Sequence, residues 1–481
     1  MALVLEYILQ NQGLSAIILS LLLVSLVALL ACLPRQLPFP DGAPKLLSEG
    51  YPVIGMLRFF SDRYNFYTDG IAASNTGSFS FYFGQHQIVG VSGPEGRKMF
   101  FQSKSMDLNE GYTALLSTTP SVKDTDRADW YSQARASMMA RGNLDQNLPF
   151  LVGDAITTFK QASGSTVTEG FIDPFDQANY AVYQSIMRVI GANEIADSKH
   201  LCTKTLDLFE QIEKGSSPAR IICPWLPTPA YLRRMTASVK LYTIFSELVQ
   251  ERKSSGREST LYASQVNTPI CVGWLLVYLA SNSYWLRLVR NETDSVLSKY
   301  RSCNETTEQT LGRLNLEAWE SEFPTIDLCL RECIRLHVSG SAFRRNKSNM
   351  DVPIGNTGEA VPRDAYVFYL FDEVHLNPDI YPDPDSWDPG RYLTDASKDK
   401  EVPLSYLGWG NGRHPCFATQ LAKLDMTIIA VVFVSMFNFS LCDEFSNPIN
   451  DPPMPDRSHP SHRKPETAVK LKYTHRRFSI L

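Results

Sequence analysis

Cys416 lies in a loop whose residues suit a metal-bound thiolate. The loop reads Trp-Gly-Asn-Gly-Arg-His-Pro-Cys-Phe-Ala over residues 409–418 and leads into a long apolar helix pattern. Gly410 and Gly412 carry no Cβ, so the backbone can pass close to a flat macrocycle such as haem. Unpaired N–H groups at the start of the next helix favour a thiolate, and an axial thiolate on haem iron favours O–O bond cleavage. A single cysteine can also be a small buried apolar residue, so the other motifs must decide.

Two segments upstream carry charged residues at spacings that suit an ionic network. A helix pattern over residues 324–336 begins at a proline, and its Glu332 and Arg335 are three positions apart, so they share one face. On a protein surface such a pair would contribute little to stability. A proline-rich segment then ends in Trp-Asp-Pro-Gly-Arg-Tyr, which places a further arginine at position 391.

Taken in their order along the chain, the Glu/Arg helix, the proline-rich segment and the cysteine loop resemble the signatures of the cytochrome P450 family. The resemblance covers about residues 50–481. The resemblance implies a mainly α-helical haem-thiolate fold with a minor β-sheet. It also implies that Arg391 joins Glu332 and Arg335 in a buried structural triad behind the haem. A family fold explains why these charged residues accompany the cysteine loop.

The resemblance assigns roles within the cysteine loop. Cys416 is the expected axial ligand of haem b iron, and Trp409 and Gly412 occupy fixed positions of the signature around the haem. His414 occupies the basic position that meets a haem propionate in the family. The family usually has Phe in place of Trp409 and Gly two positions after the cysteine, where this chain has alanine.

Other arginines are expected to bind the haem propionates. In the family, the strand after the Glu/Arg helix lines the substrate cavity with its first half and ends in a propionate-binding arginine. The spacing from the helix favours Arg345 over the adjacent Arg344. Arg127 and Arg135, which flank a tryptophan, are further candidates, although the family's spacing is not met cleanly.

Residues 263–280 resemble the helix that crosses the oxygen face of the haem. Most monooxygenases of the family place an acid and then an alcohol there, because oxygen activation needs protons. Here Val266 and Asn267 take these positions and Thr268 follows, so Asn267 and Thr268 are the candidate catalytic residues. The sequence of this segment also resembles the branch of the family that contains sterol 7α-hydroxylases and prostacyclin synthase. That branch contains hydroxylases and an isomerase, so Asn267 leaves the reaction type open.

The segment before this motif is short. The basic stretch at residues 251–257 ends a helix pattern only five residues before Ala263. Family members carry roughly thirty more residues here, by the lengths of the helices that their fold needs. Either the front of the oxygen-side helix is lost, or the sequence comes from a wrongly spliced gene model. The second explanation is favoured, because deleting several turns would open the core above the haem.

Composition indicates one large, mostly helical domain in a reducing compartment. The chain has 481 residues, 44% of them apolar, and no interior linker divides it. A net charge of −5 gives no basic stripe, so nucleic acid is not an expected partner. The nine cysteines lack the paired spacing of a disulfide framework or zinc site.

An uncharged run from Leu14 to Leu33 is long enough to span a bilayer. Glu6 and the absence of Lys or Arg before it argue against a cleaved signal peptide. Residues 34–49 form a proline-rich hinge, and Arg35 favours a cytosolic catalytic domain. We therefore expect a single-pass anchor in the endoplasmic reticulum membrane. The apolar stretch from Met426 to Phe437 is too short to span and is expected to be a buried helix.

The resemblance implies a membrane-bound monooxygenase that oxidises a lipophilic substrate with O2, using electrons from an NADPH-cytochrome reductase. The sequence at residues 406–410 resembles that of fungal pathway enzymes. By analogy, this suggests that the substrate is a terpenoid, sterol-like or polyketide-derived secondary metabolite. One alternative is a haem-thiolate isomerase or dehydratase that needs no reductase. Another is a non-catalytic haem-binding membrane protein encoded by a truncated gene model. A hydrolase built on the cysteine and its neighbouring histidine would leave the charged motifs without a purpose.

Overall fold

The computed structural model describes most of the expected catalytic domain. The described residues are 20, 36–111, 136–164, 168–214, 220, 227–254, 267–338, 340–393, 398–458 and 463–476, with no side-chain description for 251–254. The predicted anchor, apart from Ser20, lies outside them, as do Arg127, Arg135 and Val266.

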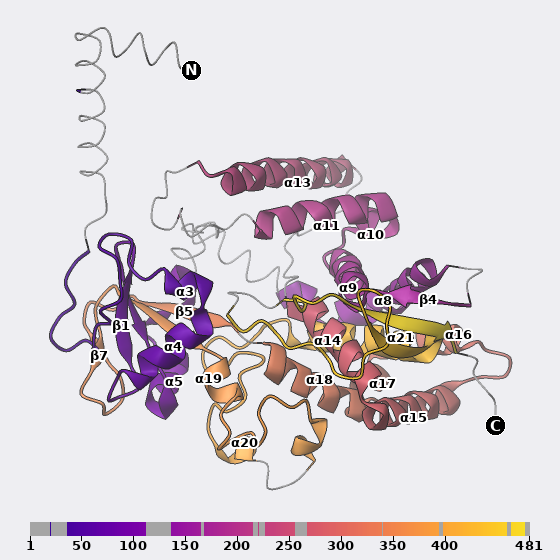
Figure 1. Cartoon of the computed structure of the whole chain (residues 1–481). Coiled ribbons are helices and arrows are strands. Elements are labelled where there is room, and N and C mark those ends of the chain that lie inside the picture. Colours follow the sequence, from indigo (N-terminus) through magenta and orange to yellow (C-terminus); the bar gives the residue numbers. More distant parts are fainter. Residues whose placement is uncertain are drawn as a thin grey trace, which may run out of the picture.

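A sheet-containing part and a larger helical part lie side by side (Figure 1). The main sheet has the strand order β1-β2-β8-β5-β3. Its strands are β1 (Phe79–Phe83), β2 (His86–Gly90), β8 (Tyr366–Leu370), β5 (Ser341–Asn346) and β3 (Met106–Asp107). The small helices beside this sheet are α3 (Arg58–Ser61), α4 (Arg63–Ala72) and α5 (Gly93–Gln102). Strands from residues 79–107 and 341–370 therefore form one sheet.

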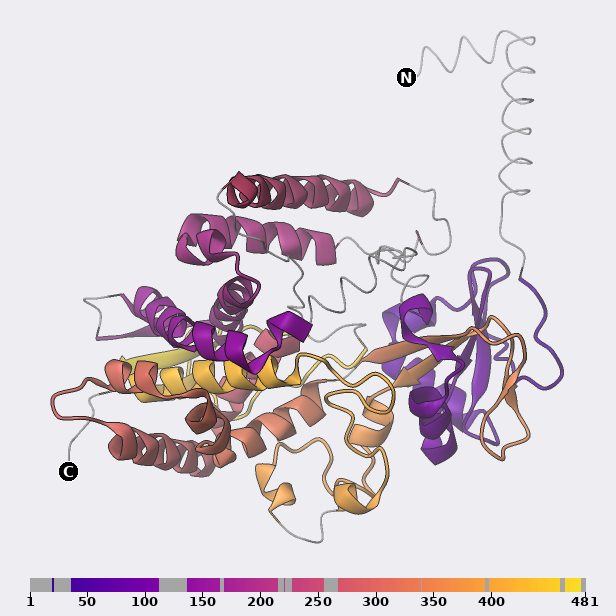
Figure 2. The same cartoon turned by 180° about the vertical axis from the view of Figure 1, so that it is seen from behind.

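The helical part carries most of the chain, as seen from behind in Figure 2. Its longer helices are α8 (Arg141–Ser163), α9 (Pro174–Val189), α11 (Lys199–Glu213), α13 (Pro229–Ser254), α14 (Asn267–Ser281), α15 (Ser283–Tyr300), α18 (Pro324–His337) and α21 (Thr419–Met436). Its shorter helices are α10 (Asn193–Asp197), α16 (Thr307–Arg313), α17 (Leu316–Ser321), α19 (Asp372–His375), α20 (Lys398–Glu401) and the 3-10 helix η1 (Pro389–Tyr392). Two small sheets complete the fold, one of β4 (Glu169–Ile172), β10 (Val469–His475) and β9 (Phe437–Asp443), the other of β6 (Val352–Pro353) and β7 (Ala360–Val361).

The core of the helical part is built around α14 and α21, which contact each other. In α14, Gly273 leaves room for the Phe175 ring of α9, because a Cβ there would lie 2.3 Å from that ring. Among the described residues, α21 is the one helix long and apolar enough to cross a bilayer, but most of it is buried. The prediction of a buried helix behind the cysteine loop is confirmed.

The interior of α21 contains a carboxyl group that has no cation beside it within the described part of the chain. Asp425 is 3% exposed, and the hydroxyl of Ser185 on α9 donates a hydrogen bond to it. Burial raises the pKa of Asp425 from 3.8 to about 7, which the Ser185 hydrogen bond only partly opposes. The native state therefore keeps this carboxyl protonated at pH values where the unfolded chain has already lost the proton.

Asp425→Asn should gain stability relative to the wild type as the pH rises. The unfolded carboxyl ionises from about pH 4 and the native one only near pH 7, so the wild type loses stability through this window. Between pH 5 and 8 the variant should gain about 2–3 kcal/mol in unfolding free energy relative to wild type. Urea unfolding at both pH values measures this, with the exposed Asp207→Asn on α11 as control. If the difference in unfolding free energy between Asp425→Asn and wild type did not change with pH, the interpretation of Asp425 as a protonated carboxyl group would be contradicted.

Candidate functional site

The cysteine loop holds Cys416 just before the N-terminus of α21. The backbone N–H of Cys416 donates to the carbonyl oxygen of Trp409 at 2.7 Å, which closes the loop. The hydroxyl of Thr419, the first residue of α21, donates to the Cys416 carbonyl oxygen at 2.8 Å. The cysteine is therefore fixed to the helix start, and its side chain is exposed.

The glycines of this loop are required by its geometry. Gly410 and Gly412 have φ angles of 66° and 64°, in the left-handed region that favours glycine. A Cβ on Gly412 would lie 2.1 Å from the carbonyl oxygen of Phe101 in α5, which also accepts the N–H of Arg413 at 3.1 Å. The loop is thus attached to α5 of the sheet-containing part on one side and to α21 on the other.

The exposed surface of the loop fits a haem. Residues 412–417 are all exposed, including the apolar ring of Phe417 at 46%. Within the described residues, no group of three or more His, Cys, Asp or Glu side chains could hold a metal ion. A single sulfur ligand suits an iron that already has four macrocycle nitrogens.

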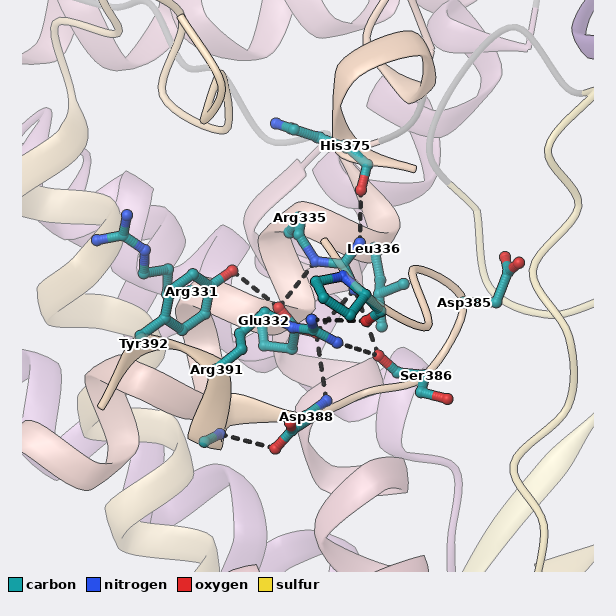
Figure 3. A network of polar contacts seen from close by, with 12 residues as sticks. Arg331, Glu332, Arg335, Leu336, His375, Asp385, Ser386, Asp388, Arg391 and Tyr392 are labelled. Carbon is teal, nitrogen blue, oxygen red and sulfur yellow. Dashed lines mark hydrogen bonds and ion pairs between the residues drawn. The ribbon is translucent and has the colours of Figure 1, made fainter. Parts of the chain in front are cut away.

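A buried ionic network joins α18 to the segment around Arg391 (Figure 3). Arg335 donates from Nε and Nη2 to the two carboxylate oxygens of Glu332, at 2.9 and 2.7 Å. Arg391 donates from Nε to Glu332 Oε1 at 2.8 Å, and the Tyr392 hydroxyl donates to Glu332 Oε2 at 2.8 Å. The side chains of Glu332 and Arg335 are fully buried. The predicted contacts of Arg391 and Arg335 with Glu332 are confirmed, while Tyr392 was not foreseen as a partner.

Electrostatics favour the charged form of Arg335 and the protonated form of Tyr392. Burial alone would lower the pKa of Arg335, but the hydrogen bonds to Glu332 raise it above its ordinary value. Burial raises the pKa of Tyr392 well above its ordinary value, and the Glu332 charge raises it further. The network therefore consists of two guanidinium cations and a phenol around one carboxylate.

His375 connects the network to the cysteine loop. Arg335 Nη1 donates to the His375 carbonyl oxygen at 2.6 Å, and the backbone N–H of Leu407 donates to His375 Nε2 at 2.9 Å. Burial lowers the pKa of His375 to about 3, so the ring is neutral. Because Nε2 accepts, the proton of the neutral ring lies on Nδ1. No signal in the sequence indicated this role of His375.

Arg344, and not Arg345, lies beside the cysteine loop. Arg345 forms ion pairs with Glu110 at 3.2 Å and Asp364 at 3.5 Å. Arg344 is 4% exposed and lies over the Phe100 ring of α5. Burial lowers the pKa of His414, and the charges of Arg344 and Arg413 lower it further. Adjacent strand residues point to opposite faces, so Arg344 and the predicted Arg345 lie on opposite sides of β5.

The candidate catalytic residues open helix α14. Asn267 is its exposed first residue and Thr268 the half-buried second. No described contact joins either residue to the cysteine loop. α14 packs on α9, α18 and α21, so it lies in the layer that adjoins the ionic network. The predicted shortening before Ala263 falls on residues 255–266, outside the described part.

Comparison with known proteins relates this chain to cytochrome P450 proteins. The cytochrome P450 family model matches residues 258–465. Cytochrome P450 monooxygenase nsrP of Aspergillus novofumigatus is 31% identical over 89% of this chain and 88% of its own. Cytochrome P450 monooxygenase AacuE of Aspergillus aculeatus is 29% identical, over 84% of this chain and 88% of its own.

A solved structure supports the fold. The retinoic acid-bound cyanobacterial CYP120A1 superposes with a TM-score of 0.70 at 18% identity, covering 91% of this chain and all of its own. The mainly helical fold with small sheets is therefore confirmed. Family members bind haem through a cysteine thiolate, and the loop geometry around Cys416 fits this group. From the sequence similarity, the fold and this loop, we conclude that the chain is a haem-dependent oxidoreductase belonging to the cytochrome P450 family.

Proposed function

We propose that this protein is a membrane-bound monooxygenase that oxidises a lipophilic secondary metabolite with electrons from an NADPH-cytochrome reductase. The observation that carries the proposal is the exposed Cys416 at the start of α21, in a chain similar to fungal cytochrome P450 monooxygenases. Haem bound there supplies oxygen activation. A terpenoid, sterol-like or polyketide-derived compound fits the relatedness to fungal enzymes.

The residues around the loop have distinct proposed roles. Cys416 would hold the haem iron through its thiolate, and the glycines of its loop would leave room for the macrocycle. His414 and Arg344 would bind the propionates, because the charge of Arg344 acts on the His414 ring and both side chains carry N–H donors. Arg345, the arginine favoured by the spacing, pairs with Glu110 and Asp364, so Arg344 is the better supported of the two.

Proton delivery is assigned to the start of α14. The Asn267 amide can hold a water molecule or a substrate oxygen through its donor and acceptor atoms. The Thr268 hydroxyl can pass a proton along such a water. This division of roles replaces the acid and alcohol that most monooxygenases of the family use.

Asn267→Ala should increase hydrogen peroxide release per NADPH consumed, by several-fold, while haem content stays unchanged. Without the Asn267 amide, the water that delivers protons would be poorly positioned. More of the reduced oxygen would then be released as hydrogen peroxide, and less would be used to oxidise the substrate. The assay is NADPH consumption and peroxide release by the full chain with a purified reductase. Asn282→Ala, which removes the N-cap side chain of α15, serves as the control.

The same assay separates the alternatives. An isomerase or dehydratase would consume no NADPH in wild type or variant, whereas rearrangement of a peroxide substrate would fall in the variant. A non-catalytic protein from a truncated gene model would show neither reaction. Full turnover by the 481-residue chain would also establish that the short segment before Ala263 is natural.

The membrane assignment rests on two groups of apolar residues. The uncharged run from Leu14 to Leu33 joins the described chain through the proline-rich hinge. Exposed apolar side chains also follow the outer face of α13 at helical spacing: Leu232, Met235, Val239 and Tyr242. A transmembrane anchor in the endoplasmic reticulum membrane with this face near the lipid fits both, with the catalytic domain in the cytosol.

A further inference from the structure

A cavity of about 200 Å³ lies between α18, α21 and the start of the cysteine loop. Its apolar lining comes from Leu330 and Ile334 of α18 and from Met426 of α21. Two aromatic residues, Tyr406 and Trp409, also line it. An apolar cavity of about 150 Å³ in another protein is large enough to bind benzene. The cavity next to the cysteine loop therefore has room for one aromatic ring with a small substituent.

This cavity is distinct from the surface of the loop that fits a haem. Of the residues that line it in the described part of the chain, none belongs to the exposed stretch 412–417, which contains Cys416. Trp409 lines the cavity, and its carbonyl oxygen accepts the Cys416 N–H at 2.7 Å. A ligand in the cavity would therefore contact the cysteine loop without occupying the haem site.

Two cations and a carboxylate of the described residues also line the cavity. Lys423 of α21 donates to Asp327 of α18 at 2.7 Å, and these two side chains are 44% and 54% exposed. Arg331 lies one helical turn after Asp327, so the two share a face of α18. Figure 3 shows the Arg331 guanidinium pointing away from Glu332. Because the charged lining residues are exposed, a small molecule can enter the cavity from solvent on their side.

Both cations have hydrogen-bond donors left over. A lysine ammonium has three N–H donors, and Lys423 uses one of them on Asp327. Arg331 Nη2 donates to Asp399 at 2.8 Å, while Arg331 Nε is buried without a hydrogen-bond partner in the described part of the chain. A ligand carboxylate could accept from both cations, since both line the same cavity. Such charge-assisted hydrogen bonds are stronger than bonds to a neutral group.

We propose that this cavity is a binding site for a small aromatic carboxylate, separate from the haem site. The aromatic ring would pack against Leu330, Met426 and Trp409, and the carboxylate would bind Lys423 and Arg331. The carboxylate of Asp327 would compete with the ligand for Lys423. The proposal goes beyond the proposed monooxygenase function and does not depend on it, because the cavity takes no part in the reaction described above.

The test compares benzoate with benzamide, a neutral ligand of similar size and shape. Isothermal titration calorimetry with the haem-containing full chain measures both dissociation constants. The wild type should bind benzoate about tenfold more tightly than benzamide, because the amide carries no charge to pair with the two cations. Lys423→Gln should weaken benzoate binding several-fold and leave benzamide binding nearly unchanged.

Asp327→Asn should change the affinity in the opposite direction. The substitution removes the carboxylate that competes for Lys423, so benzoate should bind several-fold more tightly than to wild type. A damaged fold would not increase the affinity, so this result separates a binding site from a structural effect. Lys160→Gln is the matched control, because Lys160 of α8 is a similarly exposed lysine that donates to Glu308 at 2.6 Å. It should leave both dissociation constants unchanged.

Three results would overturn the proposal. The first is the absence of measurable benzoate binding, which would mean that the cavity holds only water. The second is equal affinity of the wild type for benzoate and benzamide. The third is unchanged benzoate binding in both Lys423→Gln and Asp327→Asn, which would place the ligand elsewhere on the protein. Calorimetry needs no turnover, so each result is independent of whether the chain oxidises a substrate.

Discussion

Cys416→Ser should abolish the red-shifted Soret band that the reduced protein gives with carbon monoxide. A serine hydroxyl does not ionise at neutral pH and cannot supply the thiolate that produces this band. The structure fixes the backbone of Cys416 through Trp409 and Thr419, so the substitution changes the ligand atom while the loop keeps its hydrogen bonds. Substrate oxidation should fall to background with the band.

Cys303→Ser provides the matched control. Cys303 is also exposed and free, but it lies between α15 and α16 and outside the loop of residues 409–418. Its replacement should leave both the spectrum and the haem content unchanged. A normal thiolate spectrum in Cys416→Ser would remove this cysteine as the ligand.

Glu332→Ala should prevent the accumulation of folded, haem-containing protein. The substitution leaves the buried Arg335 and the nearly buried Arg391 without their shared carboxylate. Breaking a buried ion pair costs about 3–5 kcal/mol, which is a large part of the stability of a typical domain, about 5–15 kcal/mol. The amount of soluble protein, its haem content and its thermal unfolding midpoint measure the effect.

Glu322→Ala is the comparison for this variant. Glu322 accepts from Lys299 at 2.5 Å on the protein surface, where solvent screens the pair. Its loss should leave the yield, haem content and unfolding midpoint close to wild type. If Glu332→Ala were obtained in normal amount with full haem, the network would not be what holds the cysteine loop in place.

The charged network was predictable because its signals are local. Glu332 and Arg335 share a face of one amphipathic helix through their spacing of three, and the proline-rich motif marks Arg391. The cysteine loop was predictable for the same reason, since its glycines and Cys416 lie within seven positions. The buried helix α21 followed from its apolar pattern and its charged start.

The sequence by itself thus determined the cysteine loop, the Glu332 network and the family, all of which depend on short spacings. Only the tertiary structure decided which arginine lies beside the loop, because that depends on which face of β5 meets α5. It also revealed that His375 connects the network to the loop through Leu407. The buried position of Asp425 depends on packing against α9, whose Ser185 lies 240 positions away in the chain. Burial of an ionisable group without a counter-charge arises only when such distant segments pack together. A local sequence pattern therefore cannot predict it.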